Sequence, residues 1–157
     1  MFVPNPLTEG DHRLEADRMA DGGKLRALFD RWERVWHEGK FELVPECVAP
    51  LYIRHDEAGD RTVTREEYAA ELAKLREARP DVRIIVYDHE FVGERAWYRF
   101  TMRWTDKASG EMCTRAGLQA YRTEDGQLAE TWVVLLPLGS AWTDRVAQEN
   151  WTTPRAG

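Results

Sequence analysis

The sequence has few of the features that mark whole classes of protein. It contains only two cysteines, Cys47 and Cys113, and their wide separation favours reduced thiols over a disulfide. No apolar run approaches the roughly 20 residues that a membrane-spanning helix needs. A net charge of −6 does not favour nucleic acid or an anionic membrane as the main partner. The first residues lack the basic and then apolar pattern of a secretory signal, so we expect a cytoplasmic protein.

Metal ligands and phosphate-binding loops are equally scarce. The four histidines, His12, His37, His55 and His89, do not have the spacing of a metal site, and neither cysteine belongs to a CxxC motif. No Gly-rich loop of the kind that cradles phosphates is present. We therefore expect neither a metal nor an organic cofactor.

What the sequence does contain indicates one folded domain with a real core. Hydrophobic residues make up 43% of the 157 residues, and seven are tryptophan. Residues 1–22 are polar and rich in Pro and Gly, so we expect an N-terminal extension with at most a short helical turn. The main domain is expected over residues 23–139, and residues 140–157 form a C-terminal tail that contains Trp142 and Trp151.

The first half of the main domain is predicted to be helical. From Lys24 to a stop at Gly39, apolar residues recur at three- and four-residue spacing, which is typical of one buried helix face. These residues are Leu25, Leu28, Phe29, Trp32 and Trp36. A short amphipathic segment follows at Phe41–Val48, where Pro45 is tolerated only in a first turn or at a kink.

A strand, a loop and a further helix are expected next. Leu51–Arg54 is predicted to be a strand and residues 55–59 a loop. Thr64 and Glu67 have the spacing of a capping box, so a helix should start there with Tyr68, Leu72 and Leu75 on one face. This helix should end near Arg79, because Pro80 disfavours helical geometry in the residue before it.

The remainder is predicted to be antiparallel strands. Val82–Val92 is rich in β-branched and aromatic residues, and Ala96–Thr105 alternates between polar and apolar positions. The segment Ala116–Leu136 is a long hairpin, because Asp-Gly at its centre favours positive φ at both turn residues. Helices followed by such strands predict an α+β domain, with a curved sheet wrapped over three N-terminal helices as a container.

Several phrases in this order resemble the nuclear transport factor 2-like superfamily, which includes SnoaL-like polyketide cyclases and ketosteroid isomerases. The phrases are Trp36-His-Glu-Gly39, Tyr52-Ile-Arg-His-Asp56, Arg79-Pro-Asp-Val82, Val92-Gly-Glu-Arg95 and the close at Thr123–Trp132. The resemblance covers roughly residues 24–139. It implies a cone-shaped domain with a cavity for a small molecule, but it does not imply one reaction, because this fold hosts many.

The resemblance to ketosteroid isomerases is incomplete at the site. Their general-base Asp corresponds to Asp56, which lies after the first strand. Their oxyanion-stabilising Tyr corresponds to Trp32, and their second, protonated Asp falls near Gly117. Half of that apparatus is absent, so we do not expect steroid isomerisation.

Two related enzyme types also match only in part. The acid/base Asp and the neighbouring His of SnoaL-like cyclases correspond to Val133 and Gln119, neither of which exchanges a proton near neutral pH. In limonene epoxide hydrolases an Asp-Arg-Asp set is needed; Arg95 resembles its Arg, but Trp97 stands where an Asp is expected.

Alternation along the last hairpin predicts which side chains face the interior. If Tyr121 points inward, so do Gln119, Gly117, Arg115 and Cys113. An inward Arg115 would need an anionic or carbonyl-bearing ligand or a carboxylate such as Asp56 or Glu130; a register slip would instead leave it on the surface. The outward set, which includes Trp132 and Val134, is apolar enough to favour a homodimer through the convex face, with the C-terminal tail as an alternative cover.

The candidate catalytic residues are Asp56 and His55, of which only one should face the cavity. Desolvation at the rim of an apolar cone is expected to raise the pKa of Asp56, and the alternative is that Asp56 merely turns a surface loop. Candidate ligand-binding residues are those expected to point inward, although the aromatic ones could be plain core. They are Trp32, Tyr52, Tyr68, Tyr98, Phe100, Arg115, Gln119, Tyr121 and Val133.

Two functions remain open on these residues. One is a SnoaL-like enzyme that performs cofactor-free acid/base chemistry, of isomerase, cyclase, dehydratase or hydrolase type, on a small apolar carbonyl or hydroxyl compound. The other is a non-catalytic dimeric module that binds a ligand or a partner in the same cone.

Overall fold

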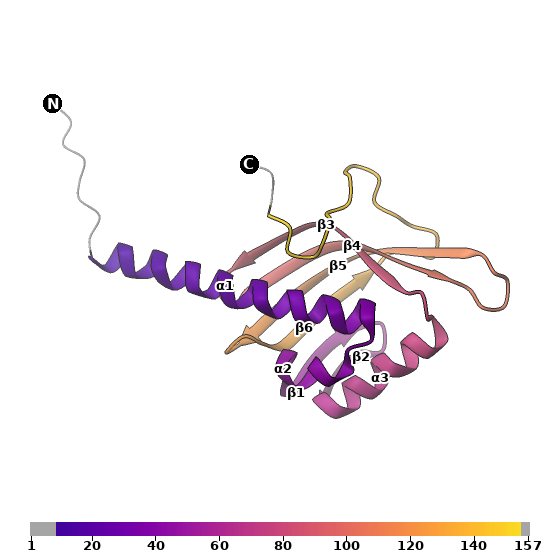
Figure 1. Ribbon diagram of the computed structural model, residues 1–157, viewed down its shortest axis with the longest axis horizontal. Helices are drawn as coiled ribbons and strands as arrows, with labels where there is room; N and C mark the ends of the chain where they lie inside the picture. Colours follow the sequence, from indigo (N-terminus) through magenta and orange to yellow (C-terminus); the bar gives the residue numbers. More distant parts are fainter. Residues whose placement is uncertain (1–8, 155–157) are drawn as a thin grey trace.

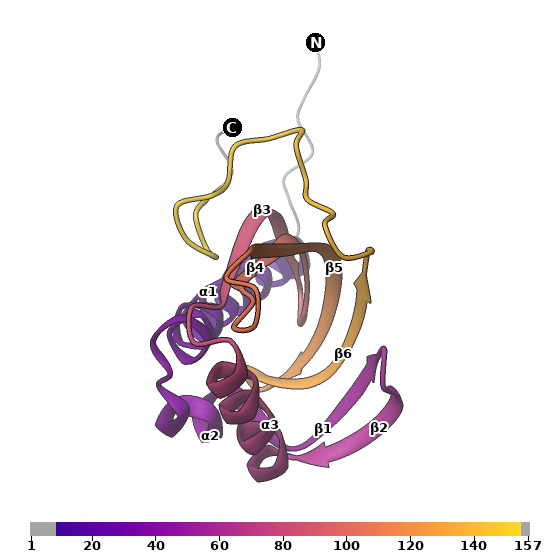
Figure 2. The same ribbon diagram turned by 90° about the vertical axis from the view of Figure 1, so that its right-hand side faces the viewer.

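A computed structural model describes residues 9–154, and it describes side chains for residue 10 and for residues 22–154. The predicted α+β architecture is confirmed: one curved six-stranded sheet wraps around helices on its concave side (Figures 1 and 2). The helices are α1 (Glu9–Glu38), the 3-10 helix η1 (Phe41–Leu43), α2 (Val44–Cys47) and α3 (Arg65–Ala78). The strands are β1 (Val48–Asp56), β2 (Gly59–Thr64), β3 (Arg83–Val92), β4 (Arg95–Thr105), β5 (Met112–Glu124) and β6 (Gln127–Leu135).

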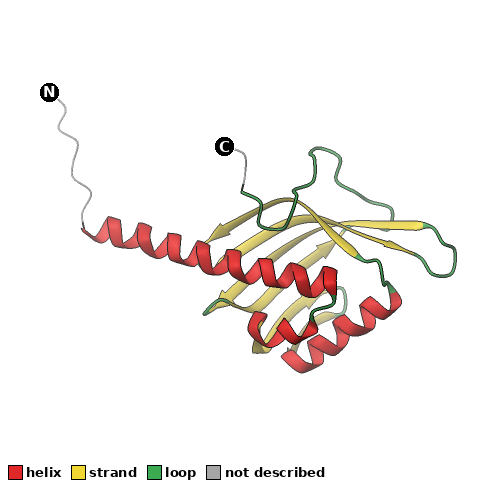
Figure 3. Ribbon diagram, in the orientation of Figure 1, coloured by secondary structure: helices red, strands yellow, loops and turns green. Residues whose placement is uncertain are grey.

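The strand order is β2-β1-β6-β5-β4-β3, and only the β1–β6 pair is parallel. The pairing of β1 with β6 shifts register between Val48 and Ile53. This stretch of β1 contains Pro50, which has no N–H to donate to a partner strand. The parallel pair brings the end of β1 beside the last hairpin, so residues distant in sequence share one inner wall (Figure 3).

The N-terminal helix is longer than the sequence pattern indicates. Helix α1 begins at Glu9 rather than near Lys24, and it continues through Gly22 and Gly23, although each Gly costs about 1 kcal/mol relative to Ala in a helix interior. The expectation of an irregular extension is therefore wrong from Glu9 onward, and its first eight residues lie outside the described part. The buried face of the helix, which includes Leu25, Phe29 and Trp32, is as predicted.

Strand β2 was not expected, and the loop predicted at residues 55–59 is a tight hairpin instead. His55 and Asp56 still belong to β1, and Asp56 pairs with Gly59 across a two-residue turn. The Ala58 amide donates to Asp56 Oδ1 over 2.9 Å, which closes the turn. Strand β2 lies at the sheet edge and buries only Val63, so its sequence carries little apolar alternation.

The other local predictions are confirmed. Thr64 and Glu67 form the capping box that starts α3, and this helix buries Tyr68 and Leu72. Pro45 lies in the first turn of α2. The turn between β5 and β6 has positive φ at Asp125 (50°) and Gly126 (74°), as a two-residue hairpin requires.

Aromatic side chains fill one end of the cone. Phe29 of α1 lies 4.9 Å from the Tyr98 ring and 5.1 Å from the Tyr121 ring, measured between centroids. Tyr98 hydrogen-bonds the backbone oxygen of Trp151. The interior is therefore packed around Phe29, and the main cavity lies toward α3 and the end of β1.

Candidate functional site

A cavity of about 330 Å³ lies between the concave face of the sheet, the C-terminal half of α1 and α3. Its volume is at the lower end of the range for small-molecule sites. Most of the wall is aromatic or aliphatic. The polar residues of the wall are Arg54, Asp56, Glu57, Arg61, Glu71 and Gln119. Such a lining suits a small, mostly apolar ligand with one or two polar groups.

Asp56 lines this cavity, because alternation along β1 points Tyr52, Arg54 and Asp56 to the concave side. Its Oδ2 atom lies 3.2 Å from Arg54 Nε and 3.3 Å from Arg61 Nη2, and its Oδ1 atom accepts from the Ala58 amide. Burial acts to raise the pKa of Asp56, but the Ala58 hydrogen bond and the charges of Arg54 and Arg61 outweigh it. The pKa therefore lies below its ordinary value, and the expected rise is wrong.

Arg54 is a buried cation in the wall of the cavity. The residue is only 8% exposed, and its guanidinium carbon lies 4.3 Å from the centroid of the Tyr68 ring and 5.3 Å from that of Tyr52. Its Nε and Nη2 atoms bind Asp56, whereas Nη1 is buried without a partner of hydrogen-bond geometry. The Tyr52 hydroxyl lies close to the guanidinium and to Thr131, and both contacts partly offset the rise in its pKa that burial causes. Arg54 is therefore a buried cation that depends on its protein neighbours.

Arg61 and Glu71 extend the charged part of the wall toward α3. Arg61 binds both oxygens of Glu71, one of them Oε2 at 3.0 Å, and also reaches Asp56. This chain of alternating charges holds the Asp56 carboxylate at Oδ2, the same oxygen that Arg54 contacts. The result is a carboxylate oxygen shared by two guanidinium groups.

The positions that carry the acid/base pair in SnoaL-like cyclases are adjacent here. Gln119 and Val133 are paired across β5 and β6, and both line the cavity. Gln119 Nε2 donates to Thr131 Oγ1 over 2.9 Å. Neither side chain is titratable, so this part of the wall can shape and orient a ligand but does not move a proton.

The position that corresponds to the second isomerase Asp has no room for a side chain. A Cβ atom on Gly117 would lie 2.7 Å from Phe100 Cζ and 2.9 Å from Leu135 Cδ2. The ring of Phe100 thus occupies the space of the missing acid. The side chains of Phe100 and Leu135, not another polar group, fill the place of the missing acid.

Most of the predicted aromatic lining is found, with two exceptions. Trp32, Tyr68, Phe100 and Tyr121 line the cavity, as does Val133. Tyr52 is fully buried behind Tyr68, whose ring lies 5.2 Å away, and burial raises its pKa. Tyr98 is displaced to the packed end, where it contacts Phe29. Neither Tyr52 nor Tyr98 belongs to the wall of the main cavity.

His55 and Arg115 also lie away from the cavity. His55 points to the convex face, where Nδ1 lies 2.7 Å from Asp60 Oδ1, Nε2 lies 2.8 Å from Glu130 Oε2, and the ring stacks on Trp132. Arg115 does not enter the cone as expected, because its long side chain bends to the rim. There it binds the Leu136 backbone oxygen and both oxygens of Glu57.

Among the residues whose side chains the structure describes, no cluster of three His, Cys, Asp or Glu side chains has the geometry to hold a metal ion. Both cysteines are free, and burial raises the pKa of Cys47 to about 11. No helix within residues 9–154 is long and apolar enough to cross a membrane.

The cavity residues that were not singled out from the sequence include Arg54, Arg61 and Trp151. The signal for Arg54 was available, since period-two alternation from an inward Asp56 places Arg54 on the same face. Arg61 belongs to the unexpected strand β2. Trp151 comes from the tail, for which the sequence indicates no direction.

The chain has many structural relatives among known proteins. Among solved structures, it resembles a SnoaL-like polyketide cyclase from Agrobacterium tumefaciens, with 17% identity, 71% of this chain and 90% of that chain covered, and a TM-score of 0.63. It also resembles TsrD from Streptomyces laurentii, with 20% identity, coverage of 72% and 88%, and a TM-score of 0.63. A protein with a ketosteroid isomerase-like fold from Catenulispora acidiphila, in complex with trimethylamine, shares 14% identity, with coverage of 68% and 83% and a TM-score of 0.58.

These identities are low, so the structural likeness establishes the fold alone. Among curated proteins, none matches the sequence. The model of the SnoaL-like polyketide cyclase family, however, matches residues 26–138, which is well over half of the chain. The matched residues include the six strands and α3, which line most of the cavity, and the chain therefore belongs to the SnoaL-like polyketide cyclase family.

Proposed function

We propose that the protein is an enzyme that moves protons on a small, mostly apolar carbonyl or hydroxyl compound held in the cavity. The reaction would be of isomerase, cyclase, dehydratase or hydrolase type. One observation carries this proposal: a carboxylate, Asp56, and a buried guanidinium, Arg54, lie side by side on a mostly apolar wall. This pair supplies a base and a stabiliser for developing negative charge in one place.

Asp56 is the proposed general base, and Oδ1 is the atom that would take the proton. A carboxylate offers about four acceptor sites. The three contacts from Arg54 and Arg61 fall on Oδ2, whereas Oδ1 accepts a hydrogen bond from the Ala58 amide. A lone pair on Oδ1 thus remains for a proton from the carbon next to a carbonyl group. The low pKa of Asp56 makes it a weak base, which suits relatively acidic carbon acids.

Arg54 is the proposed stabiliser of the oxyanion that forms when this proton leaves. Donors aimed at developing charge contribute strongly in a site shielded from water. Stacking on Tyr68 and the ion pair with Asp56 fix the guanidinium before the ligand binds. Arg54 would therefore replace the oxyanion apparatus that is missing at Trp32 and Gly117. Gln119 and the aromatic wall would orient the apolar body.

The alternative is a non-catalytic module that binds a ligand in the same cavity. Two observations favour it: Gln119 and Val133 are not titratable, and Asp56 is held charged by two arginines. In that case, Arg54 would recognise an oxygen of the ligand without any reaction.

Proton exchange separates the two functions. A panel of small cyclic and aryl ketones, led by 2-tetralone, would be incubated with the protein in D₂O, and loss of the α-proton signal would be followed by NMR. We expect catalysed exchange for the wild type, loss of exchange for Asp56→Asn with binding retained, and no change for Asp60→Asn. Asp60 is the matched control, because it pairs with His55 on the convex face. Saturating binding without exchange for the whole panel would favour the binding module.

We also propose that the protein forms a homodimer through the convex face of β5 and β6. Leu118 is 46% exposed, Trp132 36% and Val134 61%, and the described part of the C-terminal tail leaves them uncovered. Native mass measurement across a range of concentrations tests this proposal. We expect a dimer that dissociates in the Leu118→Asp and Val134→Asp double variant. A wild type that stays monomeric at high concentration would overturn it.

A further inference from the structure

The tail after β6 returns to the cavity, although the family match ends at residue 138. It leaves the sheet, crosses the convex side, where the Trp142 indole donates to the Phe100 backbone oxygen, and then bends around the β3 edge (Figures 1 and 2). Trp151 ends up only 5% exposed and is part of the cavity wall. The segment that carries it is therefore a structural addition to the family domain.

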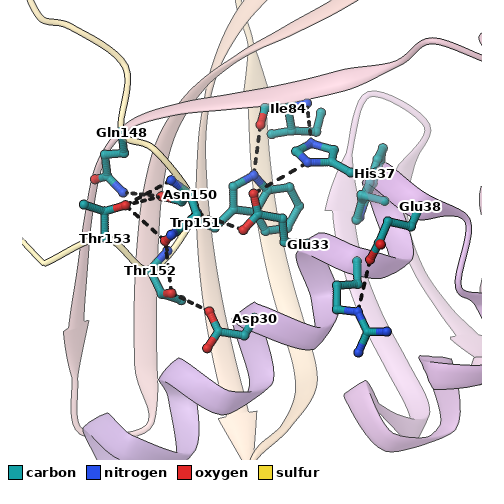
Figure 4. A network of polar contacts seen from close by, with 12 residues as sticks. Asp30, Glu33, His37, Glu38, Ile84, Gln148, Asn150, Trp151, Thr152 and Thr153 are labelled. Atoms are coloured by element: carbon teal, nitrogen blue, oxygen red, sulfur yellow. Dashed lines mark hydrogen bonds and ion pairs between the residues drawn. The ribbon is translucent and has the colours of Figure 1, made fainter.

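Trp151 is held from several sides, as Figure 4 shows. Its indole Nε1 donates to the Ile84 backbone oxygen over 2.9 Å, and its backbone amide donates to Glu33 Oε1 over 3.0 Å. Its ring meets His37 edge to face at 5.3 Å between centroids. Residues near Trp151 in the tail are fixed too. The Thr152 hydroxyl donates to the Asp30 carboxylate, and the backbone N–H of Gln148 donates to the backbone oxygen of Val86. These contacts make Trp151 a fixed wall, not a mobile lid.

Trp151 also lines a second, much smaller cavity of about 20 Å³. This cavity extends toward Phe29 and Tyr98 at the packed end of the cone, and it shares Trp151, Ile84, Phe100, Gln119 and Tyr121 with the main cavity. The two spaces are thus adjacent, and the Trp151 ring takes part in the boundary between them.

We propose that Trp151 is a specificity-determining residue that closes the end of the cavity and limits the length of the ligand. This inference rests on the proposed ligand-binding function of the cavity but not on catalysis. With Trp151 in place, the site suits short ligands of one or two rings. Without it, the space now filled by the indole would join both cavities; a cavity of roughly 150 Å³ already holds benzene.

A series of 4-alkylphenols tests the proposal, since each has a polar oxygen and an apolar body of graded length. The dissociation constants of 4-methyl-, 4-propyl- and 4-hexylphenol would be measured by calorimetry. We expect the wild type to prefer 4-methylphenol, and Trp151→Ala to shift the ratio of affinities toward 4-hexylphenol by about tenfold or more. Trp142→Ala, which removes the other tail indole outside the cavity, should leave the ratio unchanged.

A chain-length profile that is the same in Trp151→Ala and the wild type would overturn the proposal, as would failure of every phenol to bind. Should Trp151→Ala not fold, a second measurement decides. In the NMR spectrum of the wild type, the indole N–H signal of Trp151 is identified as the one that is missing from the spectrum of the Trp151→Phe variant. Saturation of the wild type with 4-methylphenol should shift this signal but not the Trp142 signal. An unmoved Trp151 signal would count against a wall role. All of these experiments measure binding and none measures turnover. Their outcome therefore does not depend on whether Asp56→Asn loses proton exchange.

Discussion

The two faces of β1 place similar groups in opposite settings. On the concave face, Arg54 and Asp56 form an ion pair inside an apolar cavity, with Arg54 only 8% exposed. On the convex face, His55 joins Glu130 and Asp60 in contacts that solvent reaches. Buried charges depend on each other, whereas exposed ones are largely satisfied by water. The face of the sheet on which a charged residue lies, not its residue type, therefore separates the candidate site from the surface.

Two histidines make the same contrast. His37 is buried, and desolvation together with the charge of Arg83 lowers its pKa to about 4. Its Nε2 accepts from the Ile84 amide over 3.0 Å, which requires an unprotonated nitrogen. On the outer face, hydrogen bonds to Glu130 and Asp60 raise the pKa of His55. The surroundings thus favour the neutral form of the His37 ring and the charged form of the His55 ring.

Breaking the inner ion pair should have the largest effect. Arg54→Met leaves Asp56 with Arg61 as its remaining cationic partner in the cavity, and we expect a loss of about 3 kcal/mol in the free energy of unfolding. The matched outer change, Arg122→Met, removes a partly buried contact to Glu130 and an exposed contact to Glu124, and it should cost less than about 1 kcal/mol. Urea unfolding at pH 7 measures both. Equal losses would mean that the inner and outer pairs do not differ in burial as described.

The buried histidine predicts a pH effect on stability. Because the folded pKa of His37 lies below its unfolded value near 6.5, its contribution is present above pH 6.5 and is lost as the pH falls toward 4. We expect His37 to account for about 2 kcal/mol of the change in unfolding free energy between these limits. His37→Gln keeps an acceptor for the Ile84 amide and should flatten this part of the profile.

His55 serves as the control for that measurement. Its raised pKa acts in the opposite sense: the contribution is present below pH 6.5 and is lost as the pH rises through the folded pKa. His55→Gln should therefore lower the free energy of unfolding below pH 6.5, whereas the loss that His37 causes as the pH falls should remain. A wild-type profile that His37→Gln does not alter would show that His37 is not held neutral.

A smaller effect is expected from the crowded inner surface of β5. Gly117→Ala places a methyl group against Phe100 and Leu135 and should destabilise the fold by about 1–3 kcal/mol. It should also weaken binding of 4-methylphenol, because Phe100 would be pushed into the cavity. Ala120→Ser on the exposed side of the same strand should change stability by less than about 0.5 kcal/mol. Unchanged stability and binding in Gly117→Ala would refute the tight fit.

The sequence predicts this fold well where the local signals are strong. The Thr64 capping box, the Asp125-Gly126 turn and the alternation along β4 each depend on neighbours in sequence, and each is confirmed. Strand β2 is missed because an edge strand that buries only Val63 carries almost no pattern. Helix α1 is underestimated because polar residues and Gly22-Gly23 do not indicate a helix.

The candidate site is less predictable, because it depends on contacts between distant segments. Asp56 is placed on the wall as the strand alternation suggests, but its pKa depends on Arg61, which an unexpected strand supplies. Arg115 is positioned by Glu57, which lies 58 residues away in the chain. Trp151 enters the wall through a path around the β3 edge that no local pattern encodes.

A structure of the protein with 2-tetralone bound tests the central proposal most directly. We expect the ketone in the cavity, with its oxygen within hydrogen-bond distance of an Arg54 nitrogen and its α-carbon facing Asp56 Oδ1. A ketone bound with its oxygen at Gln119 and its α-carbon away from Asp56, or seated outside the cavity, would contradict the assignment of Arg54 and Asp56 as the reactive pair.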